Sequence, residues 1–241
     1  QWIYSEFEKT TNLVNKHIKD FRFDEASKVI YNFVWGSYCD WYLEFLKPIF
    51  NSKDKKAKKE SSIFASYMFM NLLKLLHPFI PFFSEYMWQE NKFDKLFKND
   101  LITSSWPNPN KILSFDKSLN EIDVLIETIK SLRSTKVQLN IPPKEYCEIV
   151  YYKESKKIKT IINRNLEIIK QVGRVNKTIE KTNLILNEIQ IVILNERIGL
   201  KFQTQIDLTS QKNTLVTKEN EIDKKINILK NKLNNQNYIK K

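Results

Sequence analysis

The chain has 241 residues, of which 41% are apolar and 28% are charged, and these are ordinary values for a folded protein with one large domain or two smaller ones. No run of about 18 apolar residues is present, and the N-terminus lacks the layout of a signal peptide, so we expect a cytoplasmic protein that does not associate with a membrane. The formal charge of +12 favours polyanionic partners, nucleic acid first among them. A compositional bias towards lysine would give the same charge without a specific partner, so the charge alone leaves that alternative open.

The first fifty residues are predicted to form two amphipathic helices. Apolar residues recur at helical spacing from Trp2 to Phe21, with lysines largely on other sides. A second helix is expected to begin with Asp24 as its N-cap and to end at Pro48, because proline disrupts a helix interior. The lysine-rich run 51–61 has no apolar stripe and is predicted to be a solvated loop at the start of the next helix.

Two more helices are predicted before residue 110. One carries apolar residues from Ile63 to Leu76, two prolines then interrupt the pattern, and a fourth helix is expected from Phe82 to Phe97. Four helices joined by short connections favour an antiparallel bundle. The periodicity is lost between Asn99 and Asn110, so the bundle is assigned to residues 1–110.

A linking helix is predicted next. Helical spacing of apolar residues extends from Asp116 to Leu139, and two consecutive prolines, Pro142 and Pro143, end it. Residues 111–144 are therefore expected to connect the bundle to whatever follows.

Residues 145–206 are predicted to form a small α+β domain. A helical segment, 156–172, lies between runs that are rich in β-branched and large apolar residues. These runs are Cys147–Tyr152, Ile189–Leu194 and Ile198–Phe202. Gly199 is compatible with a tight hairpin between the last two runs.

Residues 207–241 have the apolar spacing of a coiled coil. The stripe is formed by Leu208, Leu215, Ile222, Ile226, Leu229 and Leu233. We expect this segment to be the first helix of a coiled-coil arm whose partner helix lies beyond Lys241. The predicted fold class is thus mainly α: an antiparallel helical bundle, a small α+β domain and a C-terminal coiled-coil helix.

Residues that could carry enzymatic chemistry are sparse. The three glycines are isolated, so none builds a phosphate-binding loop. Cys39 and Cys147 are far apart in sequence and indicate neither a disulfide framework nor a metal site. His77 precedes a proline and is interpreted as a helix-end residue, and Asp24 with Glu25 fits a helix start better than an acid/base pair. We therefore predict no catalytic residue, no metal site and no cofactor in this chain.

Candidate contacts with nucleic acid come from basic and aromatic residues. Between Gln211 and Lys241 eight lysines accompany three acidic residues, which suits an elongated element lying against a phosphate backbone. A solvated coiled-coil surface explains these lysines equally well. The aromatic residues of the second helix could stack on bases, but at helical spacing most are expected in the core. They are Trp35, Tyr38, Trp41 and Tyr42.

Several motifs resemble one known family. FRFDEA (Phe21–Ala26) followed by FVWGSYCDWYLEFLKP (Phe33–Pro48) closely resembles the anticodon-binding domain of valyl-tRNA synthetases. LLKLLHPFIPFFSEYMWQ (Leu72–Gln89) is similar to a segment shared by the valyl, leucyl and isoleucyl enzymes, and Trp106-Pro107 stands at the family's closing Trp-Pro element. LRSTKVQLNIPPK, residues 132–144, resembles the family's linker, and LNNQNYIKK, residues 233–241, resembles the tip of its coiled-coil arm.

The resemblance implies a tRNA-binding portion of a bacterial-type valine–tRNA ligase. In this family a helical bundle reads the anticodon region and the arm touches the outer corner of the tRNA. The ATP- and Mg²⁺-dependent attachment of valine is expected of the parent enzyme, a monomer from which this chain is a piece, and not of the chain itself. The tRNA contacts predicted on physical grounds are Lys16, Lys19 and Arg22 on the first helix, and Lys212, Lys218, Lys224, Lys225, Lys230 and Lys232 on the arm.

The sequence leaves three alternatives open. A basic coiled-coil scaffold would bind without tRNA selectivity and would associate through the last helix. The same region of a leucyl or isoleucyl enzyme would share several of the motifs. An independent thiol or metal enzyme would need a clustered site that the sequence does not offer.

Overall fold

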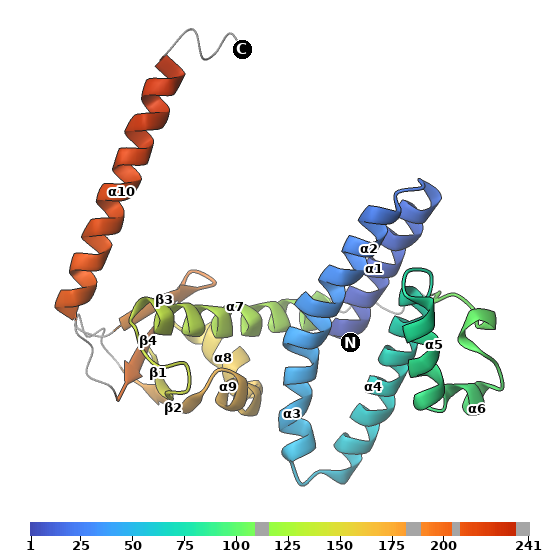
Figure 1. The fold of residues 1–241 in the computed structure, drawn as a ribbon. Helices are drawn as coiled ribbons and strands as arrows, with labels where there is room; N and C mark the ends of the chain where they lie inside the picture. The colour runs from blue at the N-terminus through green and yellow to red at the C-terminus, as the bar shows by residue number, and fades with distance from the viewer. Residues whose placement is uncertain (109–115, 182–188, 204–207, 235–241) are drawn as a thin grey trace.

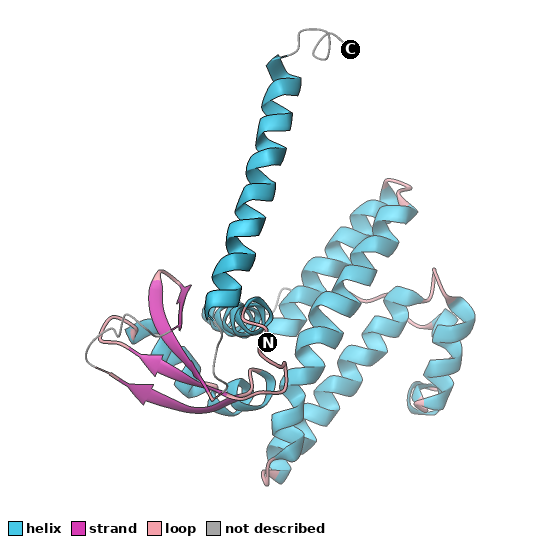
Figure 2. Cartoon of the chain, turned by 60° about the vertical axis from the view of Figure 1, so that its left-hand side comes forward, coloured by secondary structure: helices cyan, strands magenta, loops and turns pink. Residues whose placement is uncertain are grey.

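The structure is a computed structural model, and it describes residues 1–108, 116–181, 189–203 and 208–234 (Figure 1). The described part is mainly helical and contains one small sheet (Figure 2). A helical region lies at one side, helix α7 leads away from it to the sheet, and helix α10 projects from the sheet side. The mainly α class with a small α+β part is therefore confirmed.

The helical region begins with a helical hairpin. Helix α1 packs along α2, which continues through a π-helical segment, η1, into α3, and α4 follows after a short turn. Their bounds are Trp2–Lys19 for α1, Phe23–Asn32 for α2, Phe33–Tyr42 for η1, Leu43–Asn51 for α3 and Lys55–Leu76 for α4. Three of the four aromatic residues expected in the core, Tyr38, Trp41 and Tyr42, are buried, whereas Trp35 is exposed.

The helix ends differ from the predictions in this region. Asp24 does not cap α2, because Arg22 occupies the N-cap position and Asp24 lies in the first turn, where its charge still favours the helix dipole. Pro48 does not end the helix but lies inside α3, where the burial of its ring offsets the lost hydrogen bond. The predicted loop 51–61 is mostly helix, since Asp54 caps α4 by accepting hydrogen bonds from the amides of Lys56 and Ala57.

A second, smaller core follows α4. Helix α5 spans Pro81–Glu90, α6 spans Phe93–Phe97, and a short 3₁₀ turn, η2, spans Leu101–Thr103. The single helix predicted over residues 82–97 is therefore wrong, because Lys92 adopts a left-handed conformation with φ 59° between α5 and α6. Trp88 is buried here and donates from Nε1 to the carbonyl oxygen of Asn99 at 3.1 Å.

Helix α7 (Asp116–Gln138) confirms the predicted linking helix to within one residue. Its buried residues Leu125, Ile129 and Leu132 belong to one cluster of apolar side chains that extends from the helical region to the sheet. The division into segments ending at residues 110, 144 and 206 stays a prediction.

The sheet has four strands in the order β2-β1-β4-β3, with β1 parallel to β2 and antiparallel to β4. The strands are β1 (Cys147–Tyr151), β2 (Val175–Glu180), β3 (Ile189–Ile193) and β4 (Glu196–Phe202). Helices α8 (Lys156–Arg164) and α9 (Leu166–Val172) connect β1 to β2. Strand β2 was not predicted.

The β3–β4 hairpin turns at Leu194 and Asn195, not at Gly199. Both turn residues have left-handed backbones, with φ 53° and 62°, as a two-residue hairpin loop of the primed type requires. Gly199 lies inside β4 opposite Gln190 and Val150. A Cβ atom there would come within 2.3 Å of the Tyr152 hydroxyl, so the glycine is explained by close packing.

Helix α10 (Leu208–Asn234) projects away from the other elements in both views (Figures 1 and 2). Its stripe residues Ile222, Ile226, Leu229 and Leu233 are exposed. The predicted helix is thus confirmed, whereas its pairing in a coiled coil is not. Over the described residues, none of the helices is both long and apolar enough to cross a membrane.

Candidate nucleic-acid interface

The turn between α1 and α2 exposes two phenylalanine rings. Phe21 has a left-handed backbone with φ 57°, which turns its side chain away from the stripe predicted for α1, and the ring is 81% exposed. Phe23, at the start of α2, is 53% exposed. The two ring centroids are 6.4 Å apart with the ring planes at 81°. We call Phe21, Arg22 and Phe23 the tip.

The three cations predicted on the first helix lie beside the tip. Lys16 and Lys19 are exposed in the last turn of α1, and Arg22 is part of the tip itself. The Arg22 guanidinium lies 3.5 Å from the carboxylate of Glu25, an exposed pair that leaves most of its hydrogen-bonding edge open to solvent. The prediction that these residues contact RNA remains a prediction, but the structure does bring them together.

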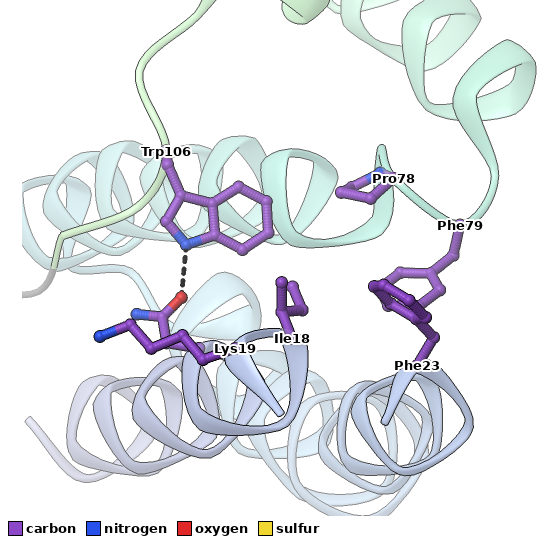
Figure 3. Close-up of a pocket in the computed structure, with 7 residues that line it drawn as sticks. Ile18, Lys19, Phe23, Pro78, Phe79 and Trp106 are labelled. Carbon is purple, nitrogen blue, oxygen red and sulfur yellow. Dashed lines mark hydrogen bonds between the residues drawn. The ribbon is translucent and has the colours of Figure 1, made fainter. Parts of the chain in front are cut away.

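A cavity of about 560 Å³ opens next to the tip (Figure 3). Phe23 and Phe79 lie at one end of it, and Trp106 faces Ile18 at the other (Figure 3). The Trp106 Nε1 donates to Oδ1 of Asn15 at 2.8 Å, which fixes the indole although part of its surface is exposed. The remaining lining residues are Asn15, Lys19 and Pro78.

The tip and the cavity together offer two kinds of contact. Exposed aromatic faces accept stacked bases of any sequence, and the neighbouring cations neutralise phosphates. An open, mostly apolar cavity beside them has room for a flat ring such as an unstacked base. This combination is typical of single-stranded loop recognition.

The cations predicted on the arm form a separate group. Lys224, Lys225 and Lys230 are exposed on α10, which projects at a distance from the tip in both views. Lys212, Lys218 and Lys232 belong to the same helix, but their side chains lie outside the described part. The structure therefore does not combine the two groups into one surface.

The two cysteines and His77 are explained by burial or by their place at a helix end. Burial raises the pKa of the Cys147 thiol to about 11, and burial also raises the pKa of Cys39, so both thiols are poor nucleophiles. His77 caps the C-terminus of α4 and its Nδ1 lies 2.9 Å from the Ser84 hydroxyl, as expected of a helix-end residue. In the parts of the chain that the structure describes, no three His, Cys, Asp or Glu residues are grouped to hold a metal ion.

Comparison with known proteins identifies the family. The anticodon-binding domain of tRNA ligase matches residues 1–151, a range that contains the tip, the cavity, α7 and β1. The chain belongs to this family.

Curated relatives match almost all of this anticodon-binding chain. A valine–tRNA ligase of Pelagibacter ubique is 36% identical over 243 residues, which cover 99% of the chain and 27% of that protein. The corresponding ligases of Agrobacterium fabrum and Staphylococcus aureus are 29% and 26% identical, with 25% and 27% of their lengths covered. The chain thus spans about a quarter of the length of the curated relatives it matches.

The two exposed phenylalanines of this anticodon-binding domain are not among the RNA contacts predicted from the sequence. Phe21 continues the helical spacing of the first helix, which predicts a place in its apolar stripe, and Phe23 enters the sequence argument only within the motif FRFDEA. The sequence does contain a signal for their exposure: two aromatic residues flank an arginine between two predicted helices, and a turn places such side chains in solvent.

Proposed function

We propose that this chain is the tRNA-binding portion of a valine–tRNA ligase, and that its tip receives the anticodon loop. The observation that carries the proposal is the pair of exposed rings at Phe21 and Phe23, with Arg22 between them and Lys16 and Lys19 beside them, in a domain of the anticodon-binding family. The printed names of the relatives supply the amino acid.

The proposal divides the tasks of the full enzyme. The ATP- and Mg²⁺-dependent attachment of valine to the tRNA belongs to parts of the enzyme outside this chain. This chain holds and orients the tRNA. We further propose that the full enzyme is a cytoplasmic monomer.

Helix α10 has its own part in the proposal. Its exposed stripe of Ile222, Ile226, Leu229 and Leu233 has the spacing of one helix of a coiled coil, and Lys224, Lys225 and Lys230 are exposed along the same helix. We assign it to an arm that lies against the outer corner of the tRNA through phosphate contacts.

The test is the binding of the purified chain to valine tRNA and to a non-cognate tRNA of equal length, titrated over salt. We expect tighter binding of the valine tRNA and an affinity that falls steeply with salt, since each neutralised phosphate releases counterions. Equal binding of both tRNAs would contradict the assigned selectivity and favour a basic scaffold. The absence of binding at low salt would contradict the proposal altogether.

A further inference from the structure

A second cavity, of about 320 Å³, lies between α3, the C-terminal half of α7 and the end of α9. Three cations line it: Arg133 and Lys136 from α7, and Arg174 directly after α9. The acidic residue Glu44 also lines it but is ion-paired with Lys47. We call this cavity the linker pocket, because Arg133 and Lys136 belong to the linker motif LRSTKVQLNIPPK, which is not part of the tip.

One of the three cations that line the linker pocket, Lys136, is buried. Lys136 is only 3% exposed, and its Nζ donates to the carbonyl oxygen of Glu145 at 2.6 Å. Burial lowers the pKa of Lys136, the guanidinium groups of Arg174 and Arg133 lower it further, and Cys147 and Glu145 act in the opposite direction. The positive charges of Lys136, Arg133 and Arg174 are therefore close enough to repel one another, and a bound anion would reduce this repulsion.

The two arginines are held by aromatic rings. The Arg133 Cζ lies 5.5 Å from the centroid of Trp41, and the Arg174 Cζ lies 5.9 Å from that of Tyr146. Stacking on a ring occupies a face of the guanidinium and leaves its in-plane N–H groups free to bind oxygen atoms. In the described part of the chain neither arginine, nor Lys136, forms a salt bridge with a carboxylate.

The backbone also gives Arg174 a special position. It has a left-handed conformation with φ 53°, at the end of a helix where glycine or asparagine is favoured. Its carbonyl oxygen accepts from the Cys147 amide at 3.0 Å, which fixes it against β1. The backbone of Arg174 is therefore held in place at the edge of the pocket that its side chain lines.

We propose that the linker pocket binds a phosphate group of the tRNA backbone, as a contact separate from the tip. The proposal rests on the proposed function and adds a second binding site to it. A phosphodiester carries one negative charge and two free oxygens, which suit two guanidinium groups and one ammonium group that line the same cavity. The C-terminal half of α7 lines this pocket, and α7 joins the helical region that carries the tip to the sheet side from which α10 projects (Figure 1), so an RNA that contacts both regions spans this helix.

Arg133→Gln and Arg174→Gln are the variants that test the proposal, with tRNA affinity measured in the full chain over a range of salt. Lys136 is left unchanged because it is buried and holds Glu145. Lys130→Gln is the matched control: it lies one turn from Arg133 on α7 and also contacts Trp41, with its Nζ 5.8 Å from the ring, but does not line the pocket. Circular dichroism and thermal unfolding verify that all three variants fold.

We expect each arginine variant to weaken binding of valine and non-cognate tRNA by about tenfold, and to lower the salt slope by about 1. The control should weaken binding far less. Equal losses in all three variants would mean a general effect of charge and would overturn the pocket, as would unchanged affinity in the arginine variants. If the unaltered chain does not bind tRNA, the proposed function fails and the inference fails with it.

A second measurement separates the tRNA backbone from a free phosphate. Inorganic phosphate is titrated into the chain at constant ionic strength, and the melting temperature is recorded for the unaltered chain and for Arg133→Gln. Stabilisation that needs Arg133, without any effect of the variant on tRNA affinity, would show a site for a small anion and overturn the assignment to tRNA. Loss of both responses in the variant supports a pocket for a backbone phosphate.

Discussion

At the scale of single residues, the tip exposes two aromatic rings to solvent, Phe21 by 81% and Phe23 by 53%. Phe23→Ala removes a ring that is about half exposed, so the free energy of unfolding should fall by only about 1 kcal/mol. Loss of a stacked base should weaken tRNA binding by about 1–3 kcal/mol. Thermal unfolding and a tRNA-binding titration measure the two effects separately.

The matched control for Phe23 is Tyr31→Ala. Tyr31 is an exposed aromatic residue on the same helix, with its ring near Trp35 rather than near the tip. Its removal should leave tRNA affinity unchanged to within about 0.5 kcal/mol. If Tyr31→Ala lowers tRNA affinity as much as Phe23→Ala does, the exposed rings of α2 contribute equally to binding, and the tip is not a specific contact site.

Cys147 gives a prediction about pH. Its pKa is about 11 in the folded chain, against 9.0 without the fold, because burial disfavours the thiolate. Between these values the unfolded chain has lost the proton and the folded chain has kept it, so unfolding becomes easier as pH rises from about 9 to 11. The contribution lost is about 3 kcal/mol and is fully present below pH 9.

Urea unfolding of the unaltered chain and of Cys147→Val between pH 8 and 11 measures this contribution. The difference in unfolding free energy between the two should shrink as pH rises. Tyr38, whose pKa burial raises to about 12, adds alkaline destabilisation to both chains and so cancels in the comparison. A difference that stays constant with pH would show that Cys147 ionises as easily in the folded chain as in the unfolded one.

At the scale of elements, the start of α4 depends on one side chain. The Oδ1 of Asp54 accepts from the amides of Lys56 at 2.9 Å and Ala57 at 3.0 Å, just before a lysine-rich first turn that has no other acidic residue. Asp54→Ala should lower the free energy of unfolding by about 1 kcal/mol. Asp54→Asn keeps an oxygen acceptor and should recover most of the loss in urea unfolding, unless the charge rather than the hydrogen bonds stabilises the helix.

Elements with a one-sided apolar stripe were predictable from the sequence, and elements without one were not. Helix α7 was located within one residue because Leu125, Ile129 and Leu132 recur on its buried side. Strand β2 escaped because Val175 is its one fully buried residue, so no alternation marks it. The same holds for the two candidate sites. The exposed lysines of the first helix were predictable from its helical spacing. The linker pocket was not, because it joins residues that are far apart in sequence and that only the fold brings together.

At the scale of the whole molecule, α10 has the apolar stripe of a paired helix but no second helix packed against it in the described part of the chain. A stripe of Ile222, Ile226, Leu229 and Leu233 gains its free energy by packing against a second helix, and in this chain the stripe is exposed. In a solution of this chain alone, the α10 of another copy is the complementary surface at hand. We therefore expect self-association that increases with protein concentration.

Sedimentation equilibrium measures this association. Leu229→Asp places a charge in the middle of the stripe and should leave the chain monomeric, while the melting temperature of the remaining fold stays the same because α10 projects away from it. Asn227→Asp introduces the same charge at an exposed position outside the stripe and should still associate. Association that persists in Leu229→Asp would place the contact elsewhere on the molecule and remove the support that the exposed stripe gives to a coiled-coil arm.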